Sequence, residues 1–301
     1  MSKEFITFGA GGDNYIEAGK RLIDQANSLE LFDKVTLYTD TDLKADTEFW
    51  EKHGEFIQKN KRGYGYWIWK SYLIKKCMDS MKDGDILLYS DCGCEIDVSE
   101  KDSMVMSFNI VKNDYIIGTN NGSTEICWNK MDLLLKMGID DEMYLHSRQR
   151  QSGAIMFLLC DKTRKLVNEW YDIACDYHNI DDTPSIAPNS DCFSEHRHDQ
   201  SVYSLLTKKY NLYSQYTLDI GCLKPIRNRT GVSRLLKKEP ESVPEPVKPP
   251  TFWQGVLMFF YSLYIKVIVF FSFIIVSIKK GLNHIRIYSI EYARFNRYQF
   301  Y

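Results

Sequence analysis

Short apolar runs alternate with helix-like segments along most of the chain, and this alternation limits the folds that are open to it. The apolar runs, which we expect to form strands, lie at residues 5–8, 34–38, 86–89, 115–118 and 154–159. The segments with the periodicity of amphipathic helices lie at residues 14–29, 42–58, 67–81, 128–137, 161–178 and 199–209. Strands that alternate with helices indicate an α/β fold, in which helices flank a mostly parallel sheet.

The alternation ends near Arg234, where the composition changes. Residues 237–250 read KKEPESVPEPVKPP, which is rich in proline and charge and has no apolar periodicity. Such a stretch predicts a semi-extended linker. We therefore expect three parts: a globular domain at 1–233, a linker at 234–250, and a hydrophobic segment with a basic end at 251–301.

Residues 251–278 are overwhelmingly apolar or aromatic, and Lys266 is their only charged residue. About 20 apolar residues are enough to cross a bilayer core, so we predict a C-terminal hydrophobic helical tail that associates with a membrane. A lysine at mid-membrane costs roughly 2.5–3.5 kcal/mol on insertion scales, and the basic residues that follow favour the cytoplasmic side. A single span and a re-entrant hairpin are both consistent with this pattern.

Charge and cysteine content argue against two classes of function. The net charge of −2 offers no general attraction to nucleic acid. The eight cysteines form no Cys-x-x-Cys pair, which argues against a zinc site. The start of the chain has no apolar signal region, so we expect the globular domain to face the cytoplasm, where cysteines stay as thiols.

The most informative stretch reads KRGYGYWIWK, at residues 61–70. Gly63 and Gly65 let the backbone turn and approach a ligand. The aromatic side chains have flat faces suited to stacking on a base or a sugar, and the cations suit a diphosphate. The residues concerned are Arg62, Tyr64, Tyr66, Trp67, Trp69 and Lys70. An aromatic cluster that packs a loop against the core would have the same composition.

A carboxylate follows the apolar run at 86–89. Asp91 comes directly after this predicted strand, and Gly93 follows two residues later. In open α/β sheets, ligands bind at the carboxyl ends of the strands, and a carboxylate there can hold Mg²⁺ or Mn²⁺ against phosphate oxygens. The alternative is that Asp91 only caps the turn that follows.

Two more polar clusters precede predicted elements. Residues 148–154 read RQRQSGA, a polar and cationic run that suits sugar or acceptor binding, although a solvated loop would look the same. Residues 196–201 read HRHDQS and open a helix. There His196 or His198 would contact a metal or phosphate, and Asp199 would bind the acceptor hydroxyl or act as a base, unless it is an ordinary helix N-cap.

Together these blocks resemble a family of bacterial and viral nucleotide-diphospho-sugar transferases of the GT-A type. The likeness runs colinearly over roughly residues 4–225. Its most specific part is the Gly-Tyr-Trp-x-Trp-Lys block joined to Asp-x-Gly-Cys, with Ser71 where proline is expected. The resemblance implies a GT-A-like (Rossmann-like) sheet, a nucleotide-sugar donor and a divalent metal, Mn²⁺ or Mg²⁺.

The resemblance also implies roles for single residues. Asp91 stands where GT-A enzymes place the first carboxylate of their Asp-x-Asp metal motif, and Gly93 takes the third position, so Glu95 or His198 would complete the metal site. Asp91 and Asp199 would be catalytic. Gly9 would contact the donor together with the aromatic block, and the remaining substrate contacts would be Gln151, Ser152, Gly153, His196 and Gln200.

These features predict a metal-assisted glycosyltransferase. It would move a sugar from a nucleotide-sugar to a hydroxyl acceptor, either a glycan or a lipid-linked one, at a membrane. The alternative is a catalytically inactive membrane protein that keeps the fold and binds a sugar or nucleotide, because the motif lacks its second aspartate. Release of a nucleoside diphosphate separates the two hypotheses.

Overall fold

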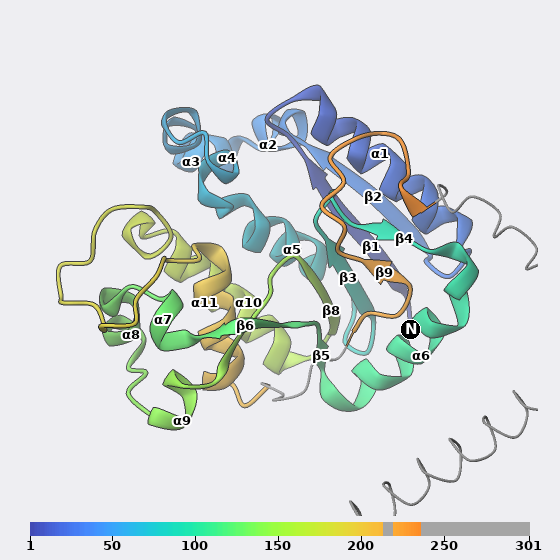
Figure 1. The fold of residues 1–301 in the computed structure, drawn as a ribbon. Coiled ribbons are helices and arrows are strands. Elements are labelled where there is room, and N and C mark those ends of the chain that lie inside the picture. Colours follow the sequence, from blue (N-terminus) through green and yellow to red (C-terminus); the bar gives the residue numbers. More distant parts are fainter. Residues whose placement is uncertain (213–218, 236–301) are drawn as a thin grey trace, which may run out of the picture. The chain divides into compact units, whose positions relative to one another are not determined.

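A central sheet with helices on both faces organises the part of the chain that the computed structural model describes, residues 1–212 and 219–235 (Figure 1). Most of the predicted linker and the whole predicted hydrophobic tail lie outside these residues, so both stay predictions. Within the described ranges, no helix combines the length and the apolar character that crossing a bilayer requires.

The main sheet has five strands in the order β2-β1-β3-β8-β5. Strand β1 (Lys3–Gly9) is parallel to β2 (Lys34–Thr39) and to β3 (Ile86–Ser90). Strand β8 (Ala154–Leu158) runs antiparallel to β3 and to β5 (Ile116–Ile117). The prediction of a mostly parallel sheet flanked by helices is confirmed, with β8 as the strand that runs against the others.

The six predicted helical segments are all helical in the structure. The helices are α1 (Asp13–Ser28), α2 (Asp40–Ala45), α3 (Thr47–Lys59), α4 (Gly63–Tyr66), α5 (Ile68–Ser80), α6 (Lys101–Asp114), α7 (Glu125–Trp128), α8 (Met131–Met137), α9 (Glu142–Leu145), α10 (Asp161–Ala174) and α11 (Asp199–Lys209). Helices that were not predicted include α6, α7 and α9. The predicted helix 42–58 is divided at Asp46, whose extended backbone ends α2 and whose carboxylate accepts the N–H of Phe49 at the start of α3.

Two small antiparallel strand pairs and two 3₁₀ turns complete the described elements. The pairs are β4 (Glu95–Ile96) with β9 (Leu223–Lys224), and β6 (Asn120–Thr124) with β7 (Arg148–Arg150). The 3₁₀ turns are η1 (Val98–Glu100) and η2 (Tyr177–Asn179). The first pair matters for the site, because it holds the C-terminal part of the described chain beside the turn after β3.

Alternate residues of the strands face two separate cores. On one face, side chains such as Leu87 and Phe157 pack with residues of α3, α5, α10 and α11. On the other face, Leu88 and Met156 pack with residues of α1 and α6. Full burial of such a side chain contributes about 1.5–3 kcal/mol, so packing on both faces stabilises the sheet. The carboxyl edge of the sheet is then left to form a site.

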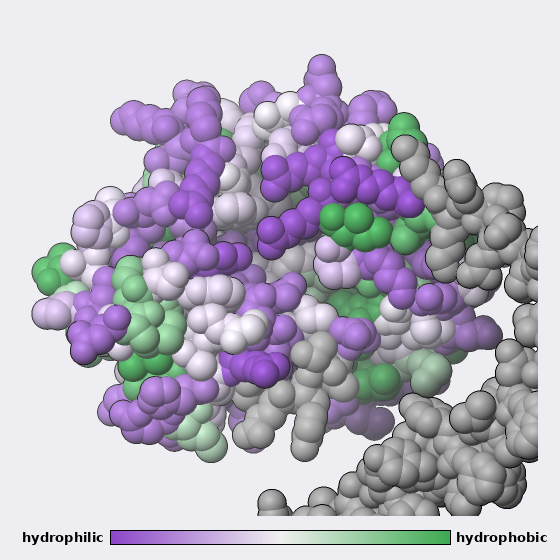
Figure 2. All heavy atoms as spheres, in the orientation of Figure 1, coloured by the Kyte–Doolittle hydropathy of each residue, from purple (hydrophilic) through white to green (hydrophobic). Residues whose placement is uncertain are grey.

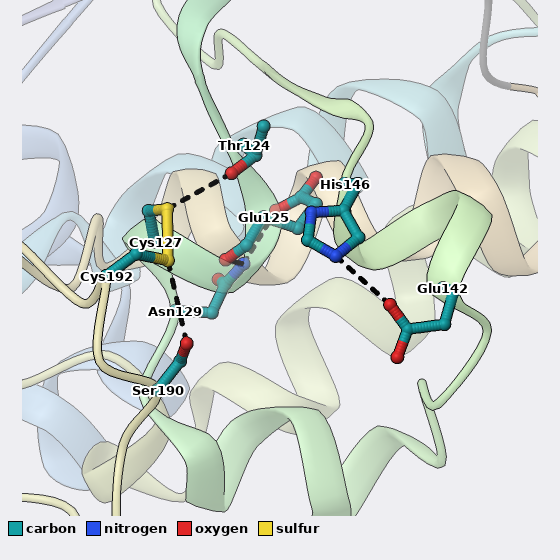
Figure 3. Close-up of a disulfide and its surroundings, with 8 residues drawn as sticks. All are labelled: Thr124, Glu125, Cys127, Asn129, Glu142, His146, Ser190 and Cys192. Atoms are coloured by element: carbon teal, nitrogen blue, oxygen red, sulfur yellow. Dashed lines mark hydrogen bonds and ion pairs between the residues drawn. A yellow bond between two sulfur atoms is a disulfide. The ribbon is translucent and has the colours of Figure 1, made fainter.

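A disulfide joins Cys127 of α7 to Cys192 in the loop before α11 (Figure 3). This corrects the expectation that all the cysteines are thiols, which rested on the lack of an apolar signal region at the start of the chain. The two residues are 65 positions apart, and only folding brings them together. The bridge ties α7 to the loop that leads to His196 and His198.

Candidate functional site

A cavity of about 900 Å³ lies at the carboxyl ends of β1 and β3. Hydrophilic side chains gather around the middle of the face shown in Figure 2. Because β8 is antiparallel, it is the start of this strand that meets the end of β3: Asp91 donates its backbone N–H to Gly153 O at 2.7 Å. The predicted site residues that line the cavity are Arg62, Tyr64, Trp67, Trp69, Lys70, Asp91, Gln151, Ser152, Gly153, His198, Asp199 and Gln200.

A buried ammonium group holds two carboxylates at the floor of this cavity. Lys70 Nζ lies 3.1 Å from Asp199 Oδ2 and 3.4 Å from Asp91 Oδ1, and only 2% of its side chain is exposed. It also donates to Ser152 Oγ at 3.2 Å, and that hydroxyl donates to Asp199 Oδ2 at 2.8 Å. Side chains from four separate segments of the chain therefore meet at the Lys70 ammonium group. The prediction that Lys70 contacts a diphosphate is corrected, because its donors already serve these three groups.

The charges in this cluster follow from burial and pairing. Burial alone would lower the pKa of Lys70, but the carboxylates of Asp199 and Asp91 outweigh it and raise that pKa. Burial raises the pKa of Asp199, and Lys70 and Ser152 oppose this rise. Lys70 is thus a permanent cation at neutral pH, and it compensates the carboxylate beside it.

Asp91 differs from Asp199 in its exposure. The side chain of Asp91 is 43% exposed and that of Asp199 is 5% exposed. Asp91 Oδ1 accepts hydrogen bonds from Tyr89 and Lys70. Its Oδ2 has no hydrogen-bond partner within residues 1–212 and 219–235, and it lies beside Gly153. Asp91 Oδ2 is therefore the carboxylate oxygen of the cluster that a substrate can reach.

The aromatic block begins with a left-handed helical turn. All five residues from Gly63 to Trp67 have positive φ, between +49° and +82°. Hydrogen bonds of the α type close the turn, from Tyr66 N to Arg62 O at 2.8 Å and from Trp67 N to Gly63 O at 3.1 Å. Left-handed backbone costs L-residues about 1–2 kcal/mol each. Such strain persists where the surroundings enforce it, often at functional sites.

The aromatic side chains divide between packing and lining. The ring of Trp69 packs against Phe8 with centroids 4.0 Å apart and ring planes tilted by 30°, and its Nε1–H donates to Gly63 O. The ring of Trp67 stacks on the His198 imidazole at 5.3 Å. Tyr66 does not line the cavity and packs against Phe56 and His198 instead. The stacking role predicted for Tyr66 is therefore corrected.

Tyr64 separates the main cavity from a second one of about 420 Å³. Gly11, Lys61 and Tyr64 line both cavities. The smaller cavity lies at the ends of β1 and β2, and Trp50 and Ile57 of α3 supply its apolar wall.

Three other predicted contacts lie away from the cavity surface. Gly9 is required for packing, because a Cβ there would lie 2.6 Å from Tyr15 O on α1. His196 is buried, and its Nε2 hydrogen-bonds to Asn179 O at 2.8 Å. Burial lowers the pKa of His196 to about 3, so it is neutral. Glu95 on β4 is fully buried. None of the three lines the cavity.

Glu95 instead anchors the C-terminal part of the described chain. Its carboxylate accepts from Asn228 Nδ2 at 2.7 Å, from the Ser233 hydroxyl and from the backbone N–H of Arg234 at 3.0 Å. Burial would raise the pKa of Glu95, but the hydrogen bonds from Ser233, Arg234 and Asn228 outweigh it and lower that pKa to about 2. The predicted metal role of Glu95 is corrected for this reason.

Sequence reasoning missed the segment that Glu95 holds. The buried guanidinium of Arg21 donates to Cys92 O, Cys94 O, Asn228 O and Thr230 O at 2.6–3.2 Å. It thereby fastens residues 228–230 to the turn after β3. Arg227 and Arg229 flank the fully buried Asn228, and both line the cavity. Residues 228–230 read Asn-Arg-Thr, a glycosylation-type sequon that gives no sign of a cavity wall.

The donor set does not fit the predicted metal site. Across residues 1–212 and 219–235, no three His, Cys, Asp or Glu side chains gather closely enough to hold a metal ion. Asp91 offers one reachable carboxylate oxygen, and Gly93 offers no side chain. His198 Nδ1 hydrogen-bonds to Ile180 O at 2.7 Å, and its buried Nε2 has no hydrogen-bond partner among the described residues and lies 3.8 Å from Asp182 Oδ1. The metal role predicted for His198 stays a prediction, and we derive no catalytic step through a metal.

Comparison with known proteins gives weak likenesses. None of the protein-family models matches the chain, and no curated protein matches it. Among solved structures, mouse xyloside xylosyltransferase 1 in its apo form is 10% identical, with 73% of this chain and 85% of that chain covered and a TM-score of 0.38. The galactosyltransferase LgtC with donor and acceptor sugar analogs is 13% identical, with 76% and 84% covered and a TM-score of 0.38. Overlaps this low carry no assignment, so function is argued from the cavity.

Proposed function

We propose that the described domain is a glycosyltransferase with a GT-A-like fold, which moves a sugar from a nucleotide-sugar to a hydroxyl acceptor. One observation carries the proposal. A single cavity at the carboxyl edge of the sheet combines a reachable carboxylate, Asp91, with a buried Lys70–Asp199 pair and a rim of arginines. Ligand sites of α/β sheets lie at this edge.

The charge of the cavity favours an anionic ligand. The whole chain has a net charge of −2, yet the cavity has seven cationic side chains and three carboxylates. The cations are Lys61, Arg62, Lys70, Arg197, Lys224, Arg227 and Arg229, and the carboxylates are Asp91, Asp199 and Asp219. Four of these cations pair with carboxylates. Lys61, Arg227 and Arg229 have no carboxylate partner among the described residues, and such guanidinium and ammonium donors bind a diphosphate well.

The two cavities suit the two ends of a nucleotide-sugar. The nucleoside would occupy the smaller cavity, against the apolar wall of Trp50 and Ile57. The diphosphate would lie where the cavities meet, at Gly11 and Lys61. The sugar would then occupy the larger cavity above Asp91. Each cavity has the volume of an ordinary small-molecule site.

The proposed chemistry is substitution at the anomeric carbon. The bond from that carbon to the β-phosphate oxygen breaks, and its electron pair stays on the oxygen. The acceptor oxygen forms the new bond, and its proton passes to Asp91 Oδ2. Asp91 Oδ2 is placed to accept a hydrogen bond from a reacting hydroxyl. Asp199, Ser152 and Lys70 are positioning residues that hold the Asp91 carboxylate; this reassigns Asp199, which was predicted to be the base.

The acceptor and the setting of the enzyme also belong to the proposal. We propose that the hydrophobic segment 251–278 keeps the domain at the cytoplasmic surface of a membrane, where a glycan or lipid-linked acceptor is reached. Partition of the full chain between membrane and soluble fractions tests this. Loss of membrane binding on replacement of 251–278 with a polar linker is the expected result, and unchanged partition contradicts it.

Turnover tests the function itself. The full chain is incubated with a panel of nucleotide-sugars and candidate acceptors, and released nucleoside diphosphate is measured. We expect release with at least one donor, and Asp91→Ala should lower it at least ~100-fold while the melting temperature stays within a few degrees. Binding without any release would support the catalytically inactive alternative. Full activity of Asp91→Ala would contradict the role of this carboxylate.

A further inference from the structure

We infer that fixed arginines, Arg227 and Arg229, stabilise the leaving diphosphate, and that donor binding needs no divalent metal. This inference rests on the proposed function and deepens it. The described residues do not provide the metal site that the sequence predicted, and they place cations at the same cavity instead. The contacts of Glu95, the fixed backbone at 227–229 and the unpaired arginine side chains support the inference.

One of the predicted metal ligands, Glu95, is engaged elsewhere. The Glu95 carboxylate is fully buried and binds Asn228, Ser233 and the backbone of Arg234. The position of the second motif carboxylate is Gly93, whose notional Cβ would lie 3.4 Å from Arg227 Cα. A metal motif normally brings a second carboxylate to the phosphates. Here the same place in the fold brings an arginine backbone.

The backbone that bears the two arginines is held rigidly. Asn228 N donates to Gly93 O at 2.8 Å, and Asn228 Nδ2 donates to Glu95 and to Val232 O, each at 2.7 Å. Arg227 itself has a left-handed φ of +57°, a conformation that costs a non-glycine residue about 1–2 kcal/mol. Because this strain is retained, the surrounding contacts enforce the position of the segment.

Both arginines are free to bind an anion. Neither has a carboxylate partner among residues 1–212 and 219–235, and Lys61, which lines the same cavity, likewise has none. Other cations of the cavity are already neutralised, as Arg62 is by Asp182 and Lys224 is by Glu100. The Arg229 guanidinium lies over the Tyr15 ring, 5.4 Å from its centroid, at the start of α1.

The chemistry of the leaving group matches these donors. When the bond to the anomeric carbon breaks, its electron pair adds negative charge to a β-phosphate oxygen. A guanidinium presents a planar fork of N–H donors that fits two phosphate oxygens at once. Two such forks on a fixed backbone would supply the charge that a bridging metal supplies in other sites.

Binding of inorganic pyrophosphate tests the inference. Isothermal titration of the full chain with pyrophosphate, UDP and GDP is done in excess chelator and again with Mg²⁺ or Mn²⁺. We expect binding in chelator, weakened ~10-fold by Arg227→Gln or Arg229→Gln and ~100-fold by the double variant. Arg148→Gln, an exposed arginine outside both cavities, is the control and should bind like the parent. Arg227→Lys and Arg229→Lys, which keep the charge without the fork, should fall between.

The outcomes separate this inference from the proposed function. Binding that requires added metal, with an affinity that is the same in both arginine variants as in the parent, would overturn the inference. It would leave the glycosyltransferase proposal standing. If none of the three ligands binds with or without metal, the proposed function itself fails. Thermal melting of each variant shows that a loss of affinity is not a loss of fold, since both side chains are exposed.

Discussion

Replacement of Lys70 with methionine tests the organisation of the site. The ammonium group is buried and lies 3.1 Å from the buried Asp199 and 3.4 Å from Asp91. Methionine fills a similar volume but leaves the Asp199 carboxylate without its counter-ion. Removal of one partner from a buried ion pair costs about 3–5 kcal/mol. For a domain of this size, that corresponds to a fall in melting temperature of ~6–20 °C.

The stability lost in Lys70→Met should depend on pH. Lys70 has a raised pKa, so its contribution to stability is fully present at neutral pH. Asp199 has a raised pKa, because burial disfavours its charged form, and without Lys70 that pKa should rise further. The folded variant therefore takes up a proton as the pH falls. The stability deficit of Lys70→Met should shrink between about pH 7 and about pH 4.5.

Chemical denaturation of the full chain at both pH values measures the deficit. The double variant Lys70→Met/Asp199→Asn is the matched control, because it removes the unpaired charge, and it should recover at least half of the lost free energy of unfolding. A deficit below ~1 kcal/mol, or one that is the same at both pH values and in the double variant, would refute the reasoning.

Three more predictions concern other parts of the described domain. Gly153→Ala should lower nucleoside diphosphate release ~10-fold with little change in melting temperature, because the new methyl group would lie 3.1 Å from Asp91 Oδ2; unaltered turnover would count against the role of that oxygen. Cys192→Ser should lower the free energy of unfolding by ~2–4 kcal/mol through loss of the bridge to Cys127, and thiol counting that finds two more free cysteines in the unreduced parent would contradict it. The pKa of Glu95 is lowered to about 2, so its contribution to stability is fully present above its ordinary pKa and is lost as the pH falls from there toward about 2. Glu95→Gln should therefore weaken the fall in the free energy of unfolding at acid pH. An unchanged fall would show that other groups control it.

The parts of the fold that depend on local periodicity could be predicted. The apolar runs and helical patterns predicted the five strands of the main sheet and most of the longer helices within a few residues, and Asp91 follows β3 as expected. The short strands of the two smaller pairs and the helix α6 were not predicted. Strand direction is different, because it depends on tertiary pairing. The antiparallel course of β8, which places Gly153 against Asp91, has no local signal in the sequence.

The site residues that were missed or misassigned have related physical causes. Glu95 is only four positions from Asp91, but β4 pairs with β9 and turns its carboxylate into a buried anchor. Arg227 and Arg229 reach the cavity because Asn228 is buried between them, and no periodic pattern in the sequence predicts this burial. The turn at Gly63–Trp67 is left-handed, whereas L-residues prefer the right-handed conformation. The spacing of the glycines therefore predicted that the chain turns here, but not that the turn is left-handed.

A crystal structure of the full chain with a nucleotide-sugar that it binds tests the central claim most directly. The account predicts the nucleoside against Trp50 and Ile57, and the diphosphate within hydrogen-bond reach of Arg227 and Arg229. Asp91 Oδ2 should stay open to the acceptor hydroxyl, with the donor sugar above it in the larger cavity. A donor seated away from this edge of the sheet, or one whose diphosphate lies far from both arginines, would contradict the proposal.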